Sequence, residues 1–188
     1  MSRKGHDMVI RALPLLCKST SDFTYLIVGD GPYRDNLEAL AADLGVHEQV
    51  VFAGHLTDEI LPDVYALCDV FVMPSRDNSM LCDIEGFGLV FLEANACGKP
   101  VIGGRSGGIP DAVVDGVTGI LVRPDDPEDI ADALKRILND NALALRLGRQ
   151  GRDRVVNQFT WGKCARNVRK ILRTVISEKK NTKKARNA

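Results

Sequence analysis

Two glutamates, Glu85 and Glu93, lie on either side of a turn that contains Gly86 and Gly88 and leads into an apolar, helix-like segment. The residues before them, 69–73, are typical of a buried strand, and open α/β sheets bind ligands at the carboxyl ends of their strands. A helix beginning near residue 88 points unpaired N–H groups and a positive dipole end at this turn, which favours phosphate. Glycine lets the backbone approach a ligand, and a carboxylate can accept from two vicinal hydroxyls. The pattern therefore predicts a site for a sugar nucleotide.

Glutamate near the start of a helix also has a purely structural explanation. A carboxylate in the first turns interacts favourably with the helix dipole by roughly 0.3–1 kcal/mol, with or without a ligand. An acid in a suggestive place is only a probabilistic pointer to function. For each glutamate taken singly, the residues leave the structural and the functional interpretation open.

Apolar periodicity alternates between helix and strand along most of the chain. Such alternation predicts a Rossmann-like, doubly wound parallel α/β sheet with helices on both faces, followed by C-terminal helices. Strands are expected at 23–28, 50–53, 69–73, 100–102 and 119–122. Helices are expected at 6–18, 32–44, 58–68, 88–97, 110–114, 127–139, 141–157 and 160–177.

The expected order lacks a strand at its beginning. A doubly wound sheet normally starts with a strand, whereas only residues 1–4 precede the first expected helix. We therefore expect a truncated chain whose first strand is missing. The expected organisation is a nucleotide-sugar-binding domain over 1–160, a C-terminal helix over 161–178 and a basic, disordered tail over 179–188.

The composition of the chain limits the classes of partner and the cellular compartment that we expect. The 188 residues carry 25 Lys and Arg against 25 Asp and Glu, which argues against nucleic acid as a partner. The basic tail offers peripheral contact with an anionic membrane surface. Five cysteines without C-x-x-C spacing, and no apolar run long enough to cross a bilayer, predict a cytoplasmic protein, peripheral at most at the inner face of the membrane. The three histidines lack metal-ligand spacing, and no Asp-x-Asp pair occurs, so no metal and no cofactor is expected.

Several motifs together resemble one family. The glutamate pair and its glycine turn are the most specific of them, and the match extends over almost the whole chain to Trp161. The chain resembles the C-terminal domain of retaining GT-B glycosyltransferases of family 4, and its loop 76–84 is most similar to phosphatidylinositol mannosyltransferases. The other matching segments are Lys4-Gly5, 28–32, 51–56, 73–75, 96–101, 107–111 and 115–119.

The resemblance implies roles for individual residues. Glu85 would lie against the donor sugar, Glu93 would bind the ribose hydroxyls, and Lys4 would meet the diphosphate, which makes Glu85 and Lys4 the catalytic candidates. The arginine that partners this lysine in the family lies upstream of the chain, and Arg3 stands in a different position. The remaining donor-binding candidates are Gly86, Phe87, Gly88, Leu89 and Val90 in the turn, and Leu56 and Asp58 in the loop that would hold the base.

Two other features near the predicted site are expected not to bind the ligand. The Gly107-Gly108 turn is expected to shape the floor of the cleft without touching a ligand. Arg76, in the ligand loop, is expected to be a solvated arginine in preference to a phosphate or acceptor ligand.

The resemblance implies transfer of a hexosyl group from a GDP- or UDP-linked sugar to an acceptor, a lipid or a glycan, with retention of configuration. The chain would supply the donor-binding half, and a missing N-terminal GT-B domain would supply the rest. Two alternatives stay open, because a fold does not fix a function. One is a GT-B-type sugar-nucleotide epimerase, and the other is a non-catalytic nucleotide-binding or regulatory module.

Overall fold

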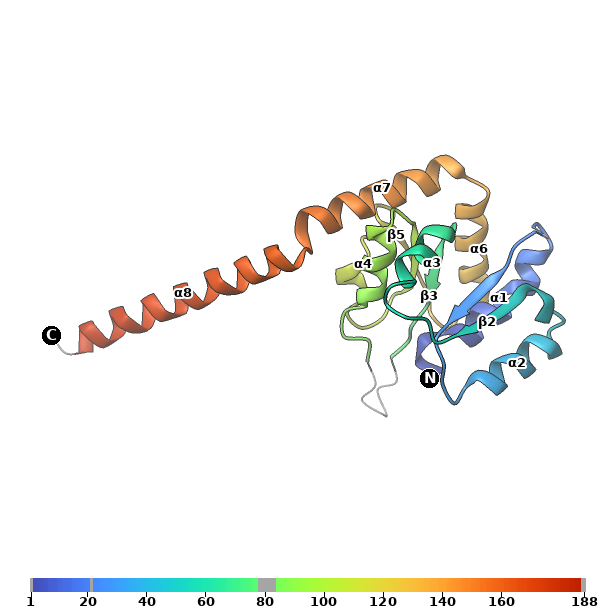
Figure 1. The fold of residues 1–188 in the computed structure, drawn as a ribbon, viewed down its shortest axis with the longest axis horizontal. Coiled ribbons are helices and arrows are strands. Elements are labelled where there is room, and N and C mark those ends of the chain that lie inside the picture. Colours follow the sequence, from blue (N-terminus) through green and yellow to red (C-terminus); the bar gives the residue numbers. More distant parts are fainter. Residues whose placement is uncertain (1, 21, 78–83, 187–188) are drawn as a thin grey trace.

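The protein is described here by a computed structural model that covers residues 2–20, 22–77 and 84–186. Helices and strands alternate in its first two thirds, as the periodicity predicts (Figure 1). The strands are β1 (Tyr25–Val28), β2 (Val50–Gly54), β3 (Phe71–Met73), β4 (Val101–Gly104) and β5 (Gly119–Val122). The helices are α1 (His6–Cys17), α2 (Arg34–Asp43), α3 (Leu61–Leu67), α4 (Leu89–Ala96), α5 (Ile109–Ala112), α6 (Pro127–Leu138), α7 (Asn141–Gln158) and α8 (Trp161–Arg186), with short 3-10 turns η1 (Ser2–Lys4) and η2 (His47–Gln49).

Every pairing between two of these named strands is parallel, which confirms the predicted class of sheet. β1 pairs with β2, and β4 lies between β3 and β5 with Ile102 opposite Val72 and Ile120. Within the described ranges no pairing joins β1 to β3. The doubly wound order 3-2-1-4-5-6 places a strand ahead of α1 between these two positions. The expected additional strand ahead of α1 stays a prediction.

Two apolar clusters hold the layers together. In the first, Val9, Ile10 and Leu13 of α1 are fully buried against α6 and the sheet. This helix continues through Pro14, as expected. The second cluster is built around Phe91 of α4, which is also fully buried. The second cluster therefore lies directly beneath the segment that carries Glu85 and Glu93.

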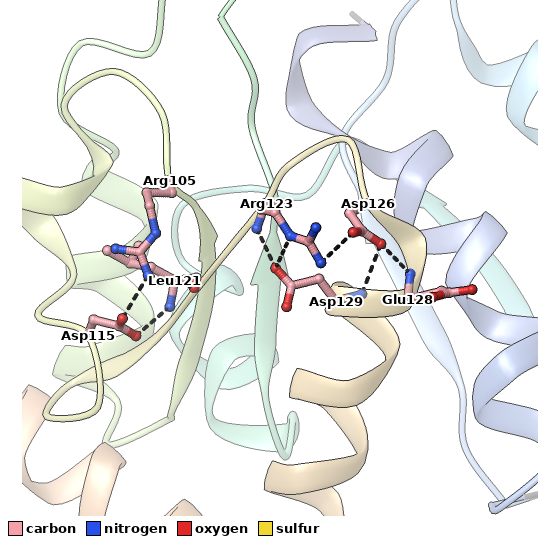
Figure 2. Close-up of polar contacts among 7 residues, drawn as sticks. All are labelled: Arg105, Asp115, Leu121, Arg123, Asp126, Glu128 and Asp129. Atoms are coloured by element: carbon pink, nitrogen blue, oxygen red, sulfur yellow. Dashed lines mark hydrogen bonds and ion pairs between the residues drawn. The ribbon is translucent and has the colours of Figure 1, made fainter.

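The outer edge of the sheet is closed by side chains (Figure 2). The N–H of Leu121 in β5 donates to Asp115 Oδ1 at 2.9 Å, and the carbonyl of Leu121 accepts from Arg105 at 3.3 Å. Arg105 and Asp115 also pair with each other at 2.8 Å. Burial raises the pKa of Asp115, but the hydrogen bonds from Leu121 and Arg105 outweigh it and bring that pKa below its usual value. Backbone groups that would offer pairing sites to another strand are thus occupied.

Charged side chains also fix the start of α6 (Figure 2). Asp126 accepts hydrogen bonds from the N–H groups of Glu128 at 3.0 Å and Asp129 at 3.2 Å, which makes it the N-cap residue. Arg123 forms ion pairs with Asp126 and Asp129. Pro127 stands at the first helical position, as the sequence predicts.

The last helix, α8, extends away from the α/β body (Figure 1). It continues to Arg186, so residues 179–186 are helical where the sequence predicts a disordered tail. Lysine, arginine and alanine are good helix formers, and neither proline nor glycine follows Gly162, so nothing in this segment ends the helix. No helix in the described part of the chain is long and apolar enough to cross a membrane.

Candidate functional site

The predicted glycine turn lies at the start of α4. Gly88 is the N-cap residue and has a left-handed backbone with φ of 83°. A Cβ at Gly88 would lie 2.6 Å from the ring of Phe91, so both the backbone conformation and the packing require glycine here. No side chain in the described ranges caps this helix, so its first N–H groups are available to a ligand. Gly86, Phe87, Gly88, Leu89 and Val90 therefore lie where the sequence predicts, at a helix N-terminus suited to an anion.

The Gly107-Gly108 turn packs against the backbone of the turn that contains Gly86 and Gly88. The N–H of Gly108 donates to the carbonyl of Glu85 at 2.9 Å, and a Cβ at Gly108 would overlap the carbonyl oxygen of Gly86. Gly107 also has a left-handed backbone, and its N–H donates to Asp77 Oδ2 at 3.1 Å. The close approach of two backbones gives this turn the structural role that we expected.

Glu85 lies in a group of cations. Lys4 Nζ donates to Glu85 Oε2 at 2.7 Å, and Arg3 Nη1 lies 3.6 Å from the same oxygen. The Glu85 side chain is only 14% exposed, so this carboxylate is largely removed from water by its neighbours. The structure thus brings together the two catalytic candidates, Lys4 and Glu85. It also brings Arg3, which sequence reasoning set aside.

The start of α1 brings Lys4 to this position. Gly5 precedes the helix with φ of 77°, and a Cβ there would overlap the carbonyl of Pro74 at the end of β3. Glycine therefore allows α1 to begin in contact with the strand end that leads into the ligand loop.

Arg76 links the start of α1 to neighbouring loops by ion pairs and a backbone hydrogen bond. Its Nη2 lies 2.8 Å from Asp7 Oδ2, its Nη1 lies 3.3 Å from Asp125 Oδ1, and its backbone N–H donates to the carbonyl of Arg3 at 2.9 Å. The side chain is 20% exposed. Arg76 is therefore a tie between the start of α1 and the ends of two strands, and the expectation of a solvated arginine is wrong.

Glu93 lies in α4, and its hydrogen-bond partner is an uncharged side chain. The hydroxyl of Tyr65 in α3 donates to Glu93 Oε2 at 2.9 Å. Glu93 is exposed, and within the described residues no ion pair reaches it. Burial is the largest cause of a raised pKa at Tyr65, and the charge of Glu93 adds to it, so the hydroxyl stays protonated and donates. Sequence reasoning missed Tyr65, because nothing in α3 marks it as part of a site.

Leu56 and Asp58 follow β2, at its carboxyl end. Leu56 is half-buried and Asp58 is exposed. Across the described ranges no hydrogen bond or ion pair joins either residue to Glu85 or Glu93, so their role at the base stays a prediction.

Two further expectations concern loop 76–84 and metal binding. Loop 76–84, which carries the likeness to phosphatidylinositol mannosyltransferases, falls largely outside the described residues, since 78–83 are not among them. Within the described part of the chain, no group of three or more His, Cys, Asp and Glu side chains is arranged to hold a metal ion. Metal independence stays a prediction.

Comparison with known proteins agrees with this geometry. The family profile of glycosyl transferases group 1 matches residues 1–154, and the chain belongs to this family. The chain is 46% identical over 159 residues to the GDP-mannose-dependent alpha-(1-6)-phosphatidylinositol monomannoside mannosyltransferase of Mycolicibacterium smegmatis. That match covers 85% of the chain and 42% of the relative.

Solved structures give the same answer for the fold. Sucrose-phosphate synthase from Thermosynechococcus elongatus superimposes with a TM-score of 0.81 at 33% identity, over 95% of this chain and 44% of that protein. Anabaena HepE in complex with UDP and glucose gives a TM-score of 0.81 at 25% identity, over 92% of this chain and 45% of that protein. The predicted fold, one half of a GT-B glycosyltransferase, is confirmed. The chain spans less than half the length of each of these three proteins.

Proposed function

We propose that this chain is the donor-binding half of a retaining glycosyltransferase that transfers a hexosyl group from a nucleotide-diphosphate sugar to a lipid or glycan acceptor. One observation carries the proposal: Lys4 and Glu85 meet at 2.7 Å beside the uncapped N-terminus of α4, and Glu93 lies further along the same helix. The arrangement offers cations and N–H groups for a diphosphate, and a carboxylate for hydroxyls on either side.

The proposed chemistry is electrostatic. The bond between the anomeric carbon and the diphosphate oxygen breaks, the acceptor oxygen forms a new bond to that carbon and loses its proton to the leaving diphosphate, and the diphosphate departs with the bonding electrons. Lys4, the first N–H groups of α4 and the nearby Arg3 would stabilise the charge that develops on the diphosphate. Glu85 would contact the transferred sugar, and Glu93 would accept hydrogen bonds from the ribose diol.

The donor is proposed from chemistry and from the relatives. The mycobacterial relative is GDP-mannose-dependent, which favours a GDP-linked mannosyl donor, whereas HepE binds UDP. The acceptor in that relative is a phosphatidylinositol monomannoside, which favours a lipid acceptor here and peripheral action at the inner face of the membrane. The epimerase and the regulatory module are not favoured, because the family and the relative described above are transferases.

We further propose that the 188-residue chain alone binds nucleotide weakly and transfers no sugar. The chain spans 42% of the mycobacterial relative, so an acceptor site and a closing domain would have to come from elsewhere. Millimolar affinity, or roughly −4 kcal/mol, is the expected scale. Transfer by the purified chain at about 1 per second or faster would contradict this proposal.

The assignment of Glu93 is tested by Glu93→Gln in this chain. An amide offers one acceptor oxygen in place of two, so the affinity for GDP or UDP should fall about tenfold, close to the lower limit for a lost hydrogen bond to a charged group. Protein-detected NMR titration of the 188-residue chain with both nucleotides measures it. Glu48→Gln, an exposed change in η2 at the amino end of β2, is the matched control and should leave the affinity unaltered. Unchanged binding in Glu93→Gln would exclude the ribose role.

A further inference from the structure

Tyr65 is held more firmly than an isolated hydrogen-bond donor would be. Its ring packs edge-on against Phe71 of β3 with a centroid separation of 5.7 Å, and Phe71 packs in the same way on Phe91 of α4 at 5.5 Å. Phe91 is fully buried and lies within the same short helix as Glu93. The three rings therefore connect the core beneath α4 to the hydroxyl that contacts Glu93.

The Glu93 side chain, by contrast, is exposed. Among the described residues its hydrogen-bond partner is Tyr65, whose hydroxyl donates to Oε2 at 2.9 Å. A glutamate with three rotatable bonds loses side-chain entropy when a ligand immobilises it. A partner that holds the carboxylate before the ligand arrives reduces that loss.

We infer that Tyr65 is a positioning residue that orients the Glu93 carboxylate toward the ribose diol of the donor and thereby favours ribonucleotides over 2′-deoxyribonucleotides. This inference rests on the proposed function. The hydroxyl of Tyr65 uses one acceptor position of Oε2 and leaves Oε1 and the second position of Oε2 for a ligand. The Glu93 carboxylate can therefore still accept hydrogen bonds from both ribose hydroxyls.

The raised pKa of Tyr65 agrees with this role. Burial is its largest cause, and the phenol stays a donor at any pH at which the protein would be assayed. Tyr65 does not reach the ligand itself in this scheme. It acts through Glu93, so its removal should matter only for ligands that Glu93 contacts.

The experiment compares GDP with 2′-deoxy-GDP on the 188-residue chain by NMR titration. Tyr65→Phe removes the hydroxyl and keeps the ring in its aromatic packing. We expect it to weaken GDP binding about threefold and to weaken the binding of 2′-deoxy-GDP, which keeps only the 3′-hydroxyl for Glu93, by a smaller factor, which lowers the ratio of the two affinities. In a Glu93→Gln background the same change should have no further effect on either ligand.

Tyr25→Phe is the matched control. It removes another tyrosine hydroxyl, one that lies 2.8 Å from His6 Nδ1, and it should leave the ratio of GDP to 2′-deoxy-GDP affinity as in the parent chain. An equal loss for both ligands in Tyr65→Phe, no loss for either, or an effect that persists in the Glu93→Gln background would overturn the inference. If Glu93→Gln itself binds GDP normally, the proposed function fails first. If Glu93→Gln loses affinity while Tyr65→Phe does not, only the role of Tyr65 fails.

Discussion

Glu85 and Glu93 begin and end the same segment, yet their surroundings differ in kind. Glu85 is largely buried and lies against two cations, Lys4 at 2.7 Å and Arg3 at 3.6 Å. Glu93 is exposed and accepts a hydrogen bond from an uncharged phenol. A buried carboxylate without cations would be costly, whereas an exposed carboxylate needs only orientation.

This difference indicates that the two glutamates are held in different ways: Glu85 by charge compensation and Glu93 by a neutral hydrogen bond. At the Glu85 end, the charges of Glu85 and Lys4 offset each other, and in the proposed function a diphosphate would replace Glu85 as the partner of the Lys4 ammonium. At the Glu93 end, the proposed function would require no such exchange, because the tyrosine and the ligand hydroxyls can occupy different acceptor positions of the carboxylate. The two ends should therefore respond differently when their partners are removed.

The largest expected effect comes from the support beneath the Glu85 end. Gly108→Ala would place a methyl group against the carbonyl of Gly86 and disturb the 2.9 Å hydrogen bond from Gly108 to Glu85. We expect the free energy of unfolding to fall by about 3 kcal/mol, the upper part of the range for overpacking. Urea denaturation followed by circular dichroism measures it.

The matched control for that change is Gly86→Ala, in the turn itself. A Cβ at Gly86 has no atom within 4 Å, so its stability should stay within about 0.5 kcal/mol of the parent chain. Equal stability losses in the two variants would show that Gly108 does not support the turn as described.

The next effect, about tenfold, separates the two glutamates. Glu85→Ala should lower the affinity for the intact donor GDP-mannose through loss of the sugar contact, and should leave the affinity for GDP the same or higher because Lys4 is released from its ion pair. Glu93→Gln should lower both affinities alike. NMR titration of both variants with both ligands gives the crossed pattern. A fall in GDP affinity in Glu85→Ala would contradict the division of work between the two ends.

Sequence alone predicted much of this molecule, for reasons that are local. The alternation of apolar periods determines where helices and strands lie to within a few residues. In the turn from Gly86 to Gly88, the glycines themselves indicate a backbone conformation that other residues rarely adopt, and Gly88 has it. Parallel pairing followed from that alternation. Apart from the end of α8, the boundaries lie within three residues of the expected ones, as at β3, where the strand begins at Phe71 and not at Asp69.

The partners of the two glutamates could not be predicted, because they come from distant parts of the chain. Lys4 is 81 positions from Glu85, and Tyr65 is 28 positions from Glu93. Only the packing of α1 against the end of β3, and of α3 against α4, brings them together. The expected disorder of residues 179–186 rests on their charge, whereas their helix propensity lets α8 continue through them.

The smallest expected effect uses pH to weaken one end only. His6 lies in the first turn of α1, two positions after Lys4, and burial is the largest cause that lowers the pKa of His6 to about 4. The unfolded chain, with an ordinary histidine pKa near 6.5, binds more protons than the folded chain between these values. The stability that neutral His6 contributes is therefore fully present above about pH 6.5 and is lost as the pH falls toward 4. Between pH 7 and pH 5.5 we expect a loss of about 1 kcal/mol.

Urea denaturation at the two pH values measures this loss in the parent chain and in His6→Gln, which cannot titrate at this position. The loss should be smaller by about 1 kcal/mol in His6→Gln and unaltered in His47→Gln, where an exposed histidine is removed instead. Because His6 belongs to the segment that carries Lys4, acidification should also lower the protection factors of amide hydrogen exchange, taken relative to the intrinsic rate at each pH, in the first turn of α1 before it affects α4, where Glu93 is located. An equal loss of protection in both helices would mean that the two ends of the site share one cooperative unit, and the contrast between Glu85 and Glu93 would then concern their chemistry alone and not their stability.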